Sequence, residues 1–234
     1  MIFQLANAPD YRFPDVEYAG PEGLLAVGGD LHTERILEAY RQGIFPWYSE
    51  DQPILWWSPD PRAVLLPENL KMSRSLRKTL RKKIFNVTFD QQFQEVIAAC
   101  ANTRRGDLEI GTWITPEMLS AYTALHKAGY AHSVEVWHEG KLAGGLYGIA
   151  LGKAFFGESM FSRVTDASKV GFSYLVRQLA KWDFHFIDCQ VESDHLASLG
   201  AKPVKRAKFI AMLKDALKYE NRVGRWKPDL EQIP

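Results

Sequence analysis

Two carboxylates and one amide interrupt mostly apolar segments in the second half of the chain. Asp188 and Gln190 end the segment 184–187, and Glu158 follows two phenylalanines and a glycine. Because side chains alternate faces along a β-strand, Asp188 and Gln190 are predicted to point to the same side. A carboxylate accepts hydrogen bonds, whereas an amide both donates and accepts them, so the pair could hold a neutral amine by its hydrogens. These residue types therefore predict the handling of an amine nucleophile.

Each carboxylate also has a structural interpretation. Asp188 could cap the segment 193–199 that follows it, and Glu158 could form a salt bridge with Arg163. In the functional interpretation, Glu158 and Asp188 lie at neighbouring strand ends and face one pocket, because a carboxylate in apolar surroundings needs a cationic or hydrogen-bonding partner. The pocket would receive a positively charged substrate. Its apolar wall is predicted to consist of Phe155, Met160 and Ile187.

A strongly basic segment covers residues 71–83, which include seven Lys or Arg residues and no acidic one. Leu76 and Leu80 are four residues apart, so a helix with Ser73 as its N-cap is predicted. The whole chain has a net charge of only +1. This helix would therefore concentrate positive charge suited to a phosphate backbone, although a solvated helix face is the plain alternative. The residues expected to contact RNA are Arg74, Arg77, Lys78, Arg81, Lys82 and Lys83.

Three tryptophans and a tyrosine fall within residues 47–57. Trp56 and Trp57 are expected to seal the joint between a small N-terminal lobe and the rest of the chain. Trp47 follows a rigid proline, and for this residue a stacking platform for a nucleobase or an aromatic group is nearly as good an interpretation as sealing the joint.

The composition is that of a folded globular protein, with 46% hydrophobic and 24% charged residues among 234. Cys100 and Cys189 lie far apart, which excludes a disulfide framework and argues against a zinc site. No stretch approaches the ~20 apolar residues of a membrane span, and the N-terminus lacks a basic region followed by an apolar run. A cytoplasmic location is expected.

The spacing of apolar residues predicts the elements that position these groups. One helix is predicted from about residue 33 to 42. Asp90 is predicted to be an N-cap, as is Thr115, which is followed by Pro116 at the first helical position. From residue 85 the predicted elements are a strand 85–89, helices 91–100 and 116–128, strands 132–138, 142–150 and 153–156, a helix 167–182, a strand 184–190 and a helix 206–219. This order indicates an α+β fold and is the order used by the acetyltransferase superfamily.

Six motifs carry a resemblance to a known family. They are Gly-Ile-Phe-Pro-Trp at 43–47, Trp-Trp-Ser-Pro-Asp-Pro-Arg at 56–62, Gly-Thr-Trp-Ile-Thr at 111–115, His-Ser-Val-Glu at 132–135, Gly-Glu-Ser-Met-Phe-Ser at 157–162 and Ile-Asp-Cys-Gln at 187–190. Together they resemble the bacterial leucyl/phenylalanyl-tRNA–protein transferases from about Gly23 to Gly200. No functional role from the family is assigned to residues outside that range.

The resemblance implies an enzyme that transfers leucine or phenylalanine, and also methionine, from aminoacyl-tRNA to the α-amino group of proteins that begin with Lys or Arg. The product carries a destabilising N-terminus that marks it for degradation by the N-end rule pathway. The implied fold is α+β, with a small N-terminal domain (residues 1–62) packed on the mixed sheet and flanking helices of a GNAT-like, acetyltransferase-like domain (residues 63–234). The enzyme is expected to act as a monomer with aminoacyl-tRNA and an acceptor protein, without a membrane, metal or other cofactor.

The resemblance also implies roles for individual residues. The 3′ adenosine of the tRNA is expected to lie between Trp47 and Trp113. The walls of the aminoacyl side-chain pocket map to Leu146, Phe155, Met160, Phe172 and Ile187. The family often has Met at the first of these positions and Leu at the fourth, so a different pocket shape with the same apolar character is expected.

The aminoacyl ester is already activated, so transfer requires a positioned neutral amine and stabilisation of the developing oxyanion. Extending the family's assignment, we predict that Gln190 accepts a hydrogen bond from the amine, while Asp188 polarises Gln190 and steadies the positive charge on the amine. Glu158 is predicted to orient the charged groups. Because an amide is a weak base, the proton is expected to end on water or on the departing ribose hydroxyl.

Three other classes of protein compete with this interpretation. An acetyl-CoA-dependent acetyltransferase would need a Gly-rich pyrophosphate loop, which residues 163–168 do not provide. An RNA-binding protein without catalysis would leave Glu158, Asp188 and Gln190 unexplained. A thiol hydrolase built on Cys189 with His185 or His195 is disfavoured, since Cys189 is predicted to face away from the Asp188 side.

Overall fold

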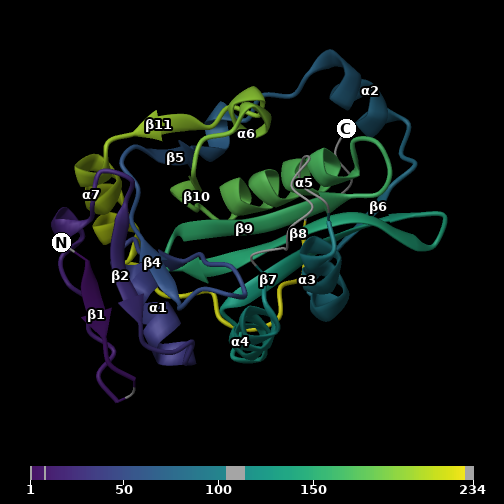
Figure 1. Cartoon of the computed structure of the whole chain (residues 1–234). Coiled ribbons are helices and arrows are strands. Elements are labelled where there is room, and N and C mark those ends of the chain that lie inside the picture. The colour runs from purple at the N-terminus through teal and green to yellow at the C-terminus, as the bar shows by residue number, and fades with distance from the viewer. Residues whose placement is uncertain (1, 8, 104–113, 230–234) are drawn as a thin grey trace.

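The computed structural model describes residues 2–7, 9–103 and 114–229, and they form two β-sheets with flanking helices (Figure 1). The N-terminal sheet has the strand order β1-β2-β4-β3. Helix α1 (Thr33–Arg41) lies between β2 and β3 in the chain and matches the predicted helix. The strands of this sheet are β1 (Phe3–Leu5), β2 (Leu24–Gly28), β3 (Phe45–Pro46) and β4 (Leu55–Trp57), and a short 3₁₀ helix η1 spans Val16–Tyr18.

The larger sheet has seven strands in the order β11-β5-β10-β9-β8-β7-β6. Its strands are β5 (Arg62–Leu65), β6 (Asn86–Phe89), β7 (Ala131–His138), β8 (Lys141–Leu151), β9 (Ala154–Ser162), β10 (Phe186–Gln190) and β11 (Lys202–Val204). Strands β9 and β10 pair in parallel, whereas the other neighbours are antiparallel. The mixed α+β class predicted from the sequence is confirmed.

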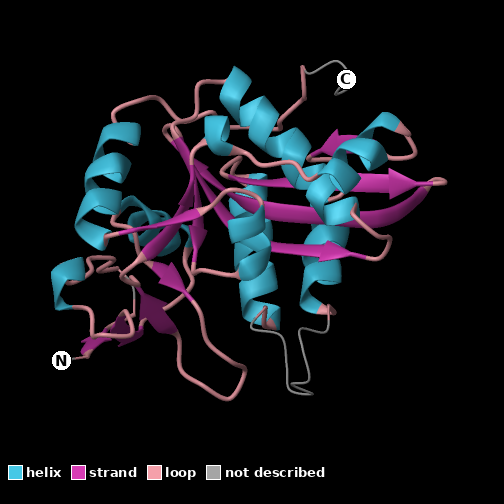
Figure 2. Ribbon diagram, turned by 90° about the horizontal axis from the view of Figure 1, so that it is seen from above, coloured by secondary structure: helices cyan, strands magenta, loops and turns pink. Residues whose placement is uncertain are grey.

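Helices cover both faces of the larger sheet (Figures 1 and 2). Helices α3 (Phe93–Ala101) and α4 (Pro116–Lys127) pack on one face, and α5 (Ala167–Lys181) packs on the other. Two hydrophobic clusters follow from this. The α4-side cluster includes Phe93, Met118, Tyr122 and Phe156 and continues into the N-terminal sheet. The α5-side cluster includes Phe155, Val170, Phe172 and Ile187. The remaining helices are η2 (Pro67–Asn69), α2 (Arg74–Arg81), α6 (Asp194–Ser198) and α7 (Arg206–Ala216).

Two predicted helix caps are confirmed. Ser73 accepts a hydrogen bond from the Leu76 amide at 3.1 Å, which begins α2. Thr115 accepts from the Met118 amide at 3.3 Å, with a proline in the first turn of α4. Both hydroxyls satisfy an amide that the first turn of a helix leaves without a backbone partner.

The prediction that Asp90 caps a helix is wrong. Helix α3 begins three residues later, and Asp90 has a positive φ of 53°. Its carboxylate instead accepts from the Ser133 amide and contacts His132 Nδ1, each at 2.8 Å. These partners lie on β7, more than 40 residues away in the sequence, so local spacing could not reveal them.

Trp56 and Trp57 were expected at the joint between the N-terminal lobe and the rest of the chain, and their described ring contacts and hydrogen bonds are with residues of the N-terminal sheet region. Trp56 is fully buried, packs edge-on against Phe13 and donates to the Gly28 carbonyl at 2.9 Å. Trp57 donates to the Trp47 carbonyl at 2.7 Å. In the part of the chain that the structure describes, no helix combines the length and the apolar character needed to cross a membrane.

Candidate active site

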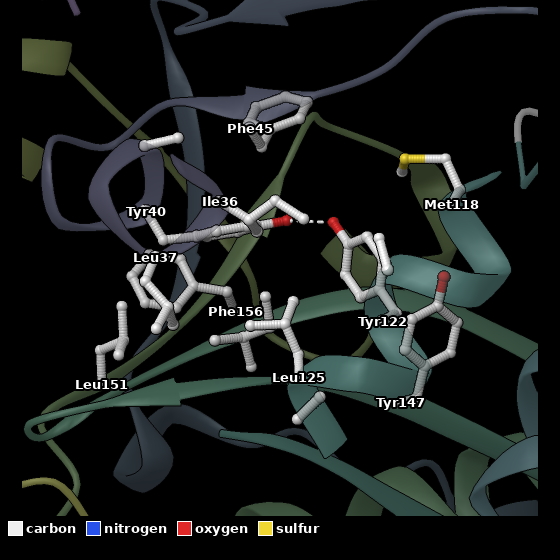
Figure 3. Close-up of a cluster of buried hydrophobic side chains, with 14 of the residues drawn as sticks. Ile36, Leu37, Tyr40, Phe45, Met118, Tyr122, Leu125, Tyr147, Leu151 and Phe156 are labelled. Carbon is white, nitrogen blue, oxygen red and sulfur yellow. Dashed lines mark hydrogen bonds between the residues drawn. The ribbon is translucent and has the colours of Figure 1, made fainter. Parts of the chain in front are cut away.

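Glu158 lies at the centre of a buried hydrogen-bonded cluster. Tyr40 of α1 donates to its Oε1 at 2.6 Å, and Tyr122 of α4 donates to its Oε2 at 3.0 Å. Gln190 Nε2 of β10 donates to Oε1 at 3.0 Å. The two phenolic oxygens lie 2.6 Å apart, and Figure 3 shows this pair surrounded by apolar side chains. Four segments that are distant in the sequence therefore converge on one carboxylate.

The cluster favours a proton on Glu158. Burial raises the pKa of Glu158 to about 7, against hydrogen bonds from Tyr40 and Tyr122 that lower it. Burial and the charge of Glu158 hold the pKa of both tyrosines well above the usual value, so they remain donors.

Asp188 is paired with a cation that the sequence analysis did not assign to the site. Arg62 Nε and Nη2 donate to the two Asp188 oxygens at 2.8 and 2.7 Å, and both side chains are fully buried. Arg62 also donates to the Gly43 carbonyl at 3.0 Å. Its guanidinium lies 4.7 Å from the Phe45 ring centroid and 4.6 Å from that of Phe209. The negative charge of Asp188 is thus already compensated within the protein.

This arrangement differs from the predicted link between Asp188 and Gln190. Asp188 Oδ1 accepts from the backbone amide of Gln190 at 2.8 Å, whereas the side-chain amide of Gln190 donates to Glu158. Gln190 has a positive φ of 62°, and the pairing of β10 with β5 shifts register between Asp188 and Gln190. Asp188 fixes the backbone of this strained residue, and Glu158 holds its side chain.

The structural interpretations of the two carboxylates are both wrong. Ser193 provides the N-cap of α6, so Asp188 does not cap that segment. Arg163 donates to the Leu142 carbonyl and lies over the Phe161 ring, and the described partners of Glu158 do not include it.

The site lies where the two parallel strands stop pairing. Strands β9 and β10 are in register from Ala154 with Phe186 to Phe156 with Asp188. Beyond these residues come Glu158 and Gln190. On β9, Gly157 and Ser159 pair with consecutive residues of β8, which leaves Glu158 outside the regular pairing. Glu158 thus lies in a bulge within β9, and bulges re-aim side chains next to many active sites.

The five residues mapped to the aminoacyl pocket all contribute to the α5-side cluster: Leu146, Phe155, Phe172 and Ile187 are buried members and Met160 is partly buried against it. Tyr40 and Tyr122, by contrast, belong to the α4-side cluster. The apolar and the polar groups therefore contact helices on opposite faces of the sheet, and they approach each other only around the ends of β9 and β10.

The residues expected to contact RNA lie on the surface. Trp47 is 44% exposed and makes a tilted contact with Trp57, with ring centroids 5.9 Å apart. Trp113 lies outside the described residues, so only one of the two predicted stacking rings is seen. All six basic residues assigned to tRNA contact are exposed, and within the described ranges none of them forms a salt bridge: Arg74, Arg77, Lys78, Arg81, Lys82 and Lys83.

Two further observations bear on alternative chemistry. Cys189 is buried, and burial raises the pKa of its thiol, which opposes formation of the thiolate that a thiol hydrolase needs. In the described parts of the chain, no three His, Cys, Asp or Glu side chains form a group that could hold a metal ion.

Sequence reasoning missed three members of the site: Arg62, Tyr40 and Tyr122. Arg62 ends one of the quoted motifs, but a lone arginine gives no signal for a buried partner 126 residues later. The tyrosines occupy buried helix positions and look like ordinary core residues in the sequence.

Comparisons with known proteins identify the family of the chain. A family model described as leucyl/phenylalanyl-tRNA protein transferase matches residues 64–214, and one for the N-terminal domain of the same family matches residues 29–60. A leucyl/phenylalanyl-tRNA–protein transferase of Nitrosospira multiformis is 55% identical to this chain. The matched region spans 96% of this chain and 97% of the relative's length. The corresponding protein of Legionella pneumophila (strain Corby) is 53% identical, over 96% of this chain and 100% of its own.

Solved structures give weaker likenesses. A GCN5-related N-acetyltransferase from Kribbella flavida has a TM-score of 0.38 at 10% identity, covering 71% of this chain and 59% of its own. L-PGS from Bacillus licheniformis has a TM-score of 0.39 at 10% identity, over 74% and 57% of the two chains. At these scores neither supports a further argument.

The mixed sheet, the buried polar cluster and the matches define the chain as an aminoacyltransferase that takes its acyl group from tRNA. In particular, it belongs to the leucyl/phenylalanyl-tRNA–protein transferase family.

Proposed function

We propose that this enzyme transfers leucine, phenylalanine or methionine from aminoacyl-tRNA to the α-amino group of proteins that begin with Arg or Lys. The observation that carries the proposal is the Glu158 cluster, a buried carboxylate that holds the Gln190 amide from one side. With its Nε2 donating to Glu158, Gln190 presents its Oε1 as an acceptor. A neutral amine has hydrogens to donate to that oxygen.

In the proposed reaction, the amine nitrogen attacks the ester carbonyl carbon of the aminoacyl-tRNA. A C–N bond forms, the bond from that carbon to the ribose oxygen breaks, and the ribose hydroxyl leaves with a proton that originates on the amine. Gln190 orients the amine, and Glu158 in its ionised form polarises Gln190. Asp188 acts as a positioning residue, because its charge is neutralised by Arg62 and its Oδ1 fixes the Gln190 backbone.

The acceptor's positive charge would be received at this end of the sheet, where Glu158 is the carboxylate without a cationic partner among its described contacts. The aminoacyl side chain would contact the apolar residues on the α5 side, beyond the point where β9 and β10 stop pairing. These are Leu146, Phe155, Met160, Phe172 and Ile187. The acceptor amine and the ester carbonyl would meet at Gln190.

The tRNA would be held by stacking and by charge. Trp47 offers an exposed ring for the 3′ adenosine, with Trp113 as its expected partner. The unpaired basic residues of α2 and the following turn supply contacts to the phosphate backbone. We further propose that the N-terminal and GNAT-like domains divide near residue 62, that the enzyme acts as a monomer in the cytoplasm, and that its product is an N-degron.

The test uses purified enzyme, radiolabelled leucyl-tRNA and two peptides that differ only in an N-terminal Arg or Ala, with no other cofactor added. Label on the Arg peptide alone is expected. Equal labelling of both peptides would refute the acceptor rule. Labelling of neither peptide, with tRNA still retained on a filter, would favour a binding protein and make the Glu158 cluster structural.

A further inference from the structure

A C-terminal strap, residues 220–229, crosses the end of the larger sheet after the last helix. Asn221 Oδ1 accepts from the Gly152 amide at 2.7 Å in the β8–β9 turn, and the Gly224 amide donates to the Gly129 carbonyl at 3.1 Å. Near the end of α5, the Asp229 amide donates to Gln178 Oε1 at 3.0 Å. The strap therefore attaches both to the sheet and to the helix on its α5 side.

Trp226 is the buried side chain of the strap, with 3% exposure. Its ring stacks on His132 with centroids 3.6 Å apart and an interplanar angle of 9°. It meets Trp182 edge-on at 5.0 Å and Phe184 at 6.0 Å. Its backbone amide donates to Asp90 Oδ2 at 2.6 Å. The unexpected position of Asp90 is thus explained, because one carboxylate joins β7 to the strap.

The fourth aromatic neighbour of Trp226 is Phe155, with ring centroids 6.0 Å apart. Phe155 is buried on β9, and it pairs in register with Ile187 of β10. A Cβ added to Gly148 would come within 2.5 Å of the Phe155 ring, so this ring lies against the glycine backbone of β8. Phe155 therefore has the glycine backbone of β8 against its ring and the Trp226 ring among its aromatic neighbours.

We propose that Trp226 is a positioning residue that sets the depth of the aminoacyl side-chain pocket by holding Phe155 in place. This inference rests on the proposed function, which makes Phe155 a pocket wall. The indole Nε1 donates to the Arg222 carbonyl within the strap at 3.1 Å, whereas the hydrogen bonds that join the strap to the sheet and to α5 come from other groups. Shortening Trp226 therefore leaves the strap attached while it removes the support behind Phe155. Phe155 then moves back, and the pocket becomes better suited to a larger side chain.

The experiment measures kcat/KM for leucyl-tRNA and phenylalanyl-tRNA with one Arg-initiated peptide in full-length Trp226→Leu. The ratio of phenylalanine to leucine transfer is expected to rise roughly 5- to 30-fold, the range set by a small volume change in an apolar pocket. Trp226→Phe should keep the ratio within about threefold of wild type. A ratio does not depend on the fraction of folded enzyme, so lost stability alone cannot move it.

Two comparison variants separate the possible failures. Trp137→Leu shortens a partly buried tryptophan whose Nε1 donates to Thr88 Oγ1 at 2.8 Å and whose described contacts do not include Phe155. The ratio of phenylalanine to leucine transfer should not change in this variant. Phe155→Leu should shift the ratio, and adding Trp226→Leu to it should have little further effect. If Phe155→Leu leaves the ratio unchanged, the pocket assignment itself fails. If Phe155→Leu shifts the ratio and Trp226→Leu does not, the role of Trp226 is refuted.

Discussion

Glu158 shows how a single residue combines stability and chemistry. Its carboxyl is buried among two phenols and an amide, with a pKa raised to about 7, so near neutral pH it is divided between charged and neutral forms. In the proposed mechanism, only the charged form polarises Gln190 toward an amine. The same burial makes ionisation costly for the fold, since the folded protein retains a proton that the unfolded chain releases.

Replacement of Glu158 by Gln should reveal both effects. Transfer by the wild type is expected to rise with pH through about 7. The variant should lose at least about tenfold of kcat and keep only the pH dependence of the acceptor's own α-amine, whose pKa is ordinarily about 8. Stability runs the opposite way, because the contribution of Glu158 is present below its unfolded pKa and is lost as pH rises through 7, by about 3 kcal/mol. In urea titrations, the unfolding free energy of the variant relative to the wild type should therefore increase between pH 4.5 and pH 8. A constant difference across that range would contradict the raised pKa.

Arg62 is expected to be needed chiefly because it pairs with Asp188. Arg62→Leu leaves a buried carboxylate without a cation, which should cost about 3–5 kcal/mol of unfolding free energy by urea titration. Arg62→Leu/Asp188→Leu should recover much of that stability but not the transfer activity. A loss below about 1 kcal/mol in the single variant would show that the pair is not held as described.

At the scale of elements, the strands and long helices follow from the sequence, whereas the site does not. The caps Ser73 and Thr115 and the periodic apolar residues predicted α2, α4, α5 and the meander because these signals are local. The partners of Asp90, Asp188 and Glu158 lie on other elements, so no local spacing reveals them. Residue type and position identified Gln190 and Glu158, and the family resemblance added their roles, but only the structure shows that they contact each other.

Helix α2 carries the prediction about tRNA. In Lys78→Gln/Lys82→Gln, KM for aminoacyl-tRNA should rise several-fold with kcat unchanged, since phosphate contacts contribute to binding and not to the reaction step. The slope of log Kd against log salt should fall by about 0.7–0.9 for each contact removed. A matched change of two exposed lysines on α7, Lys208→Gln/Lys214→Gln, should leave both values near wild type. Equal effects in the two double variants would indicate that tRNA binding depends on the net charge of the protein and not on the position of the lysines on α2.

The N-terminal lobe and the larger sheet are joined at the Glu158 cluster, to which α1 of the lobe contributes Tyr40. Tyr40 contacts Tyr122 and Glu158 and lies edge-on to Phe156. The smaller lobe therefore contributes a side chain to the Glu158 cluster and also supports Trp47.

A double-mutant cycle tests that coupling. Tyr40→Phe and Tyr122→Phe should each lower unfolding free energy by about 1–3 kcal/mol and reduce kcat/KM. Their combined effect should depart from additivity by more than about 0.5 kcal/mol, because each loses a partner that the other supplies. Additive losses would mean that the two phenols act independently.

The position of the strap also has a consequence for synthesis on the ribosome. Residues 220–229 emerge after the strands and helices that they join, so His132, Trp182 and Phe155 are exposed on the nascent chain until Trp226 arrives. The sheet and α5 can assemble before that moment, yet the apolar site beside them stays open at one end. The aromatic side chains around Phe155 therefore reach their final packing only after residue 226 has joined them.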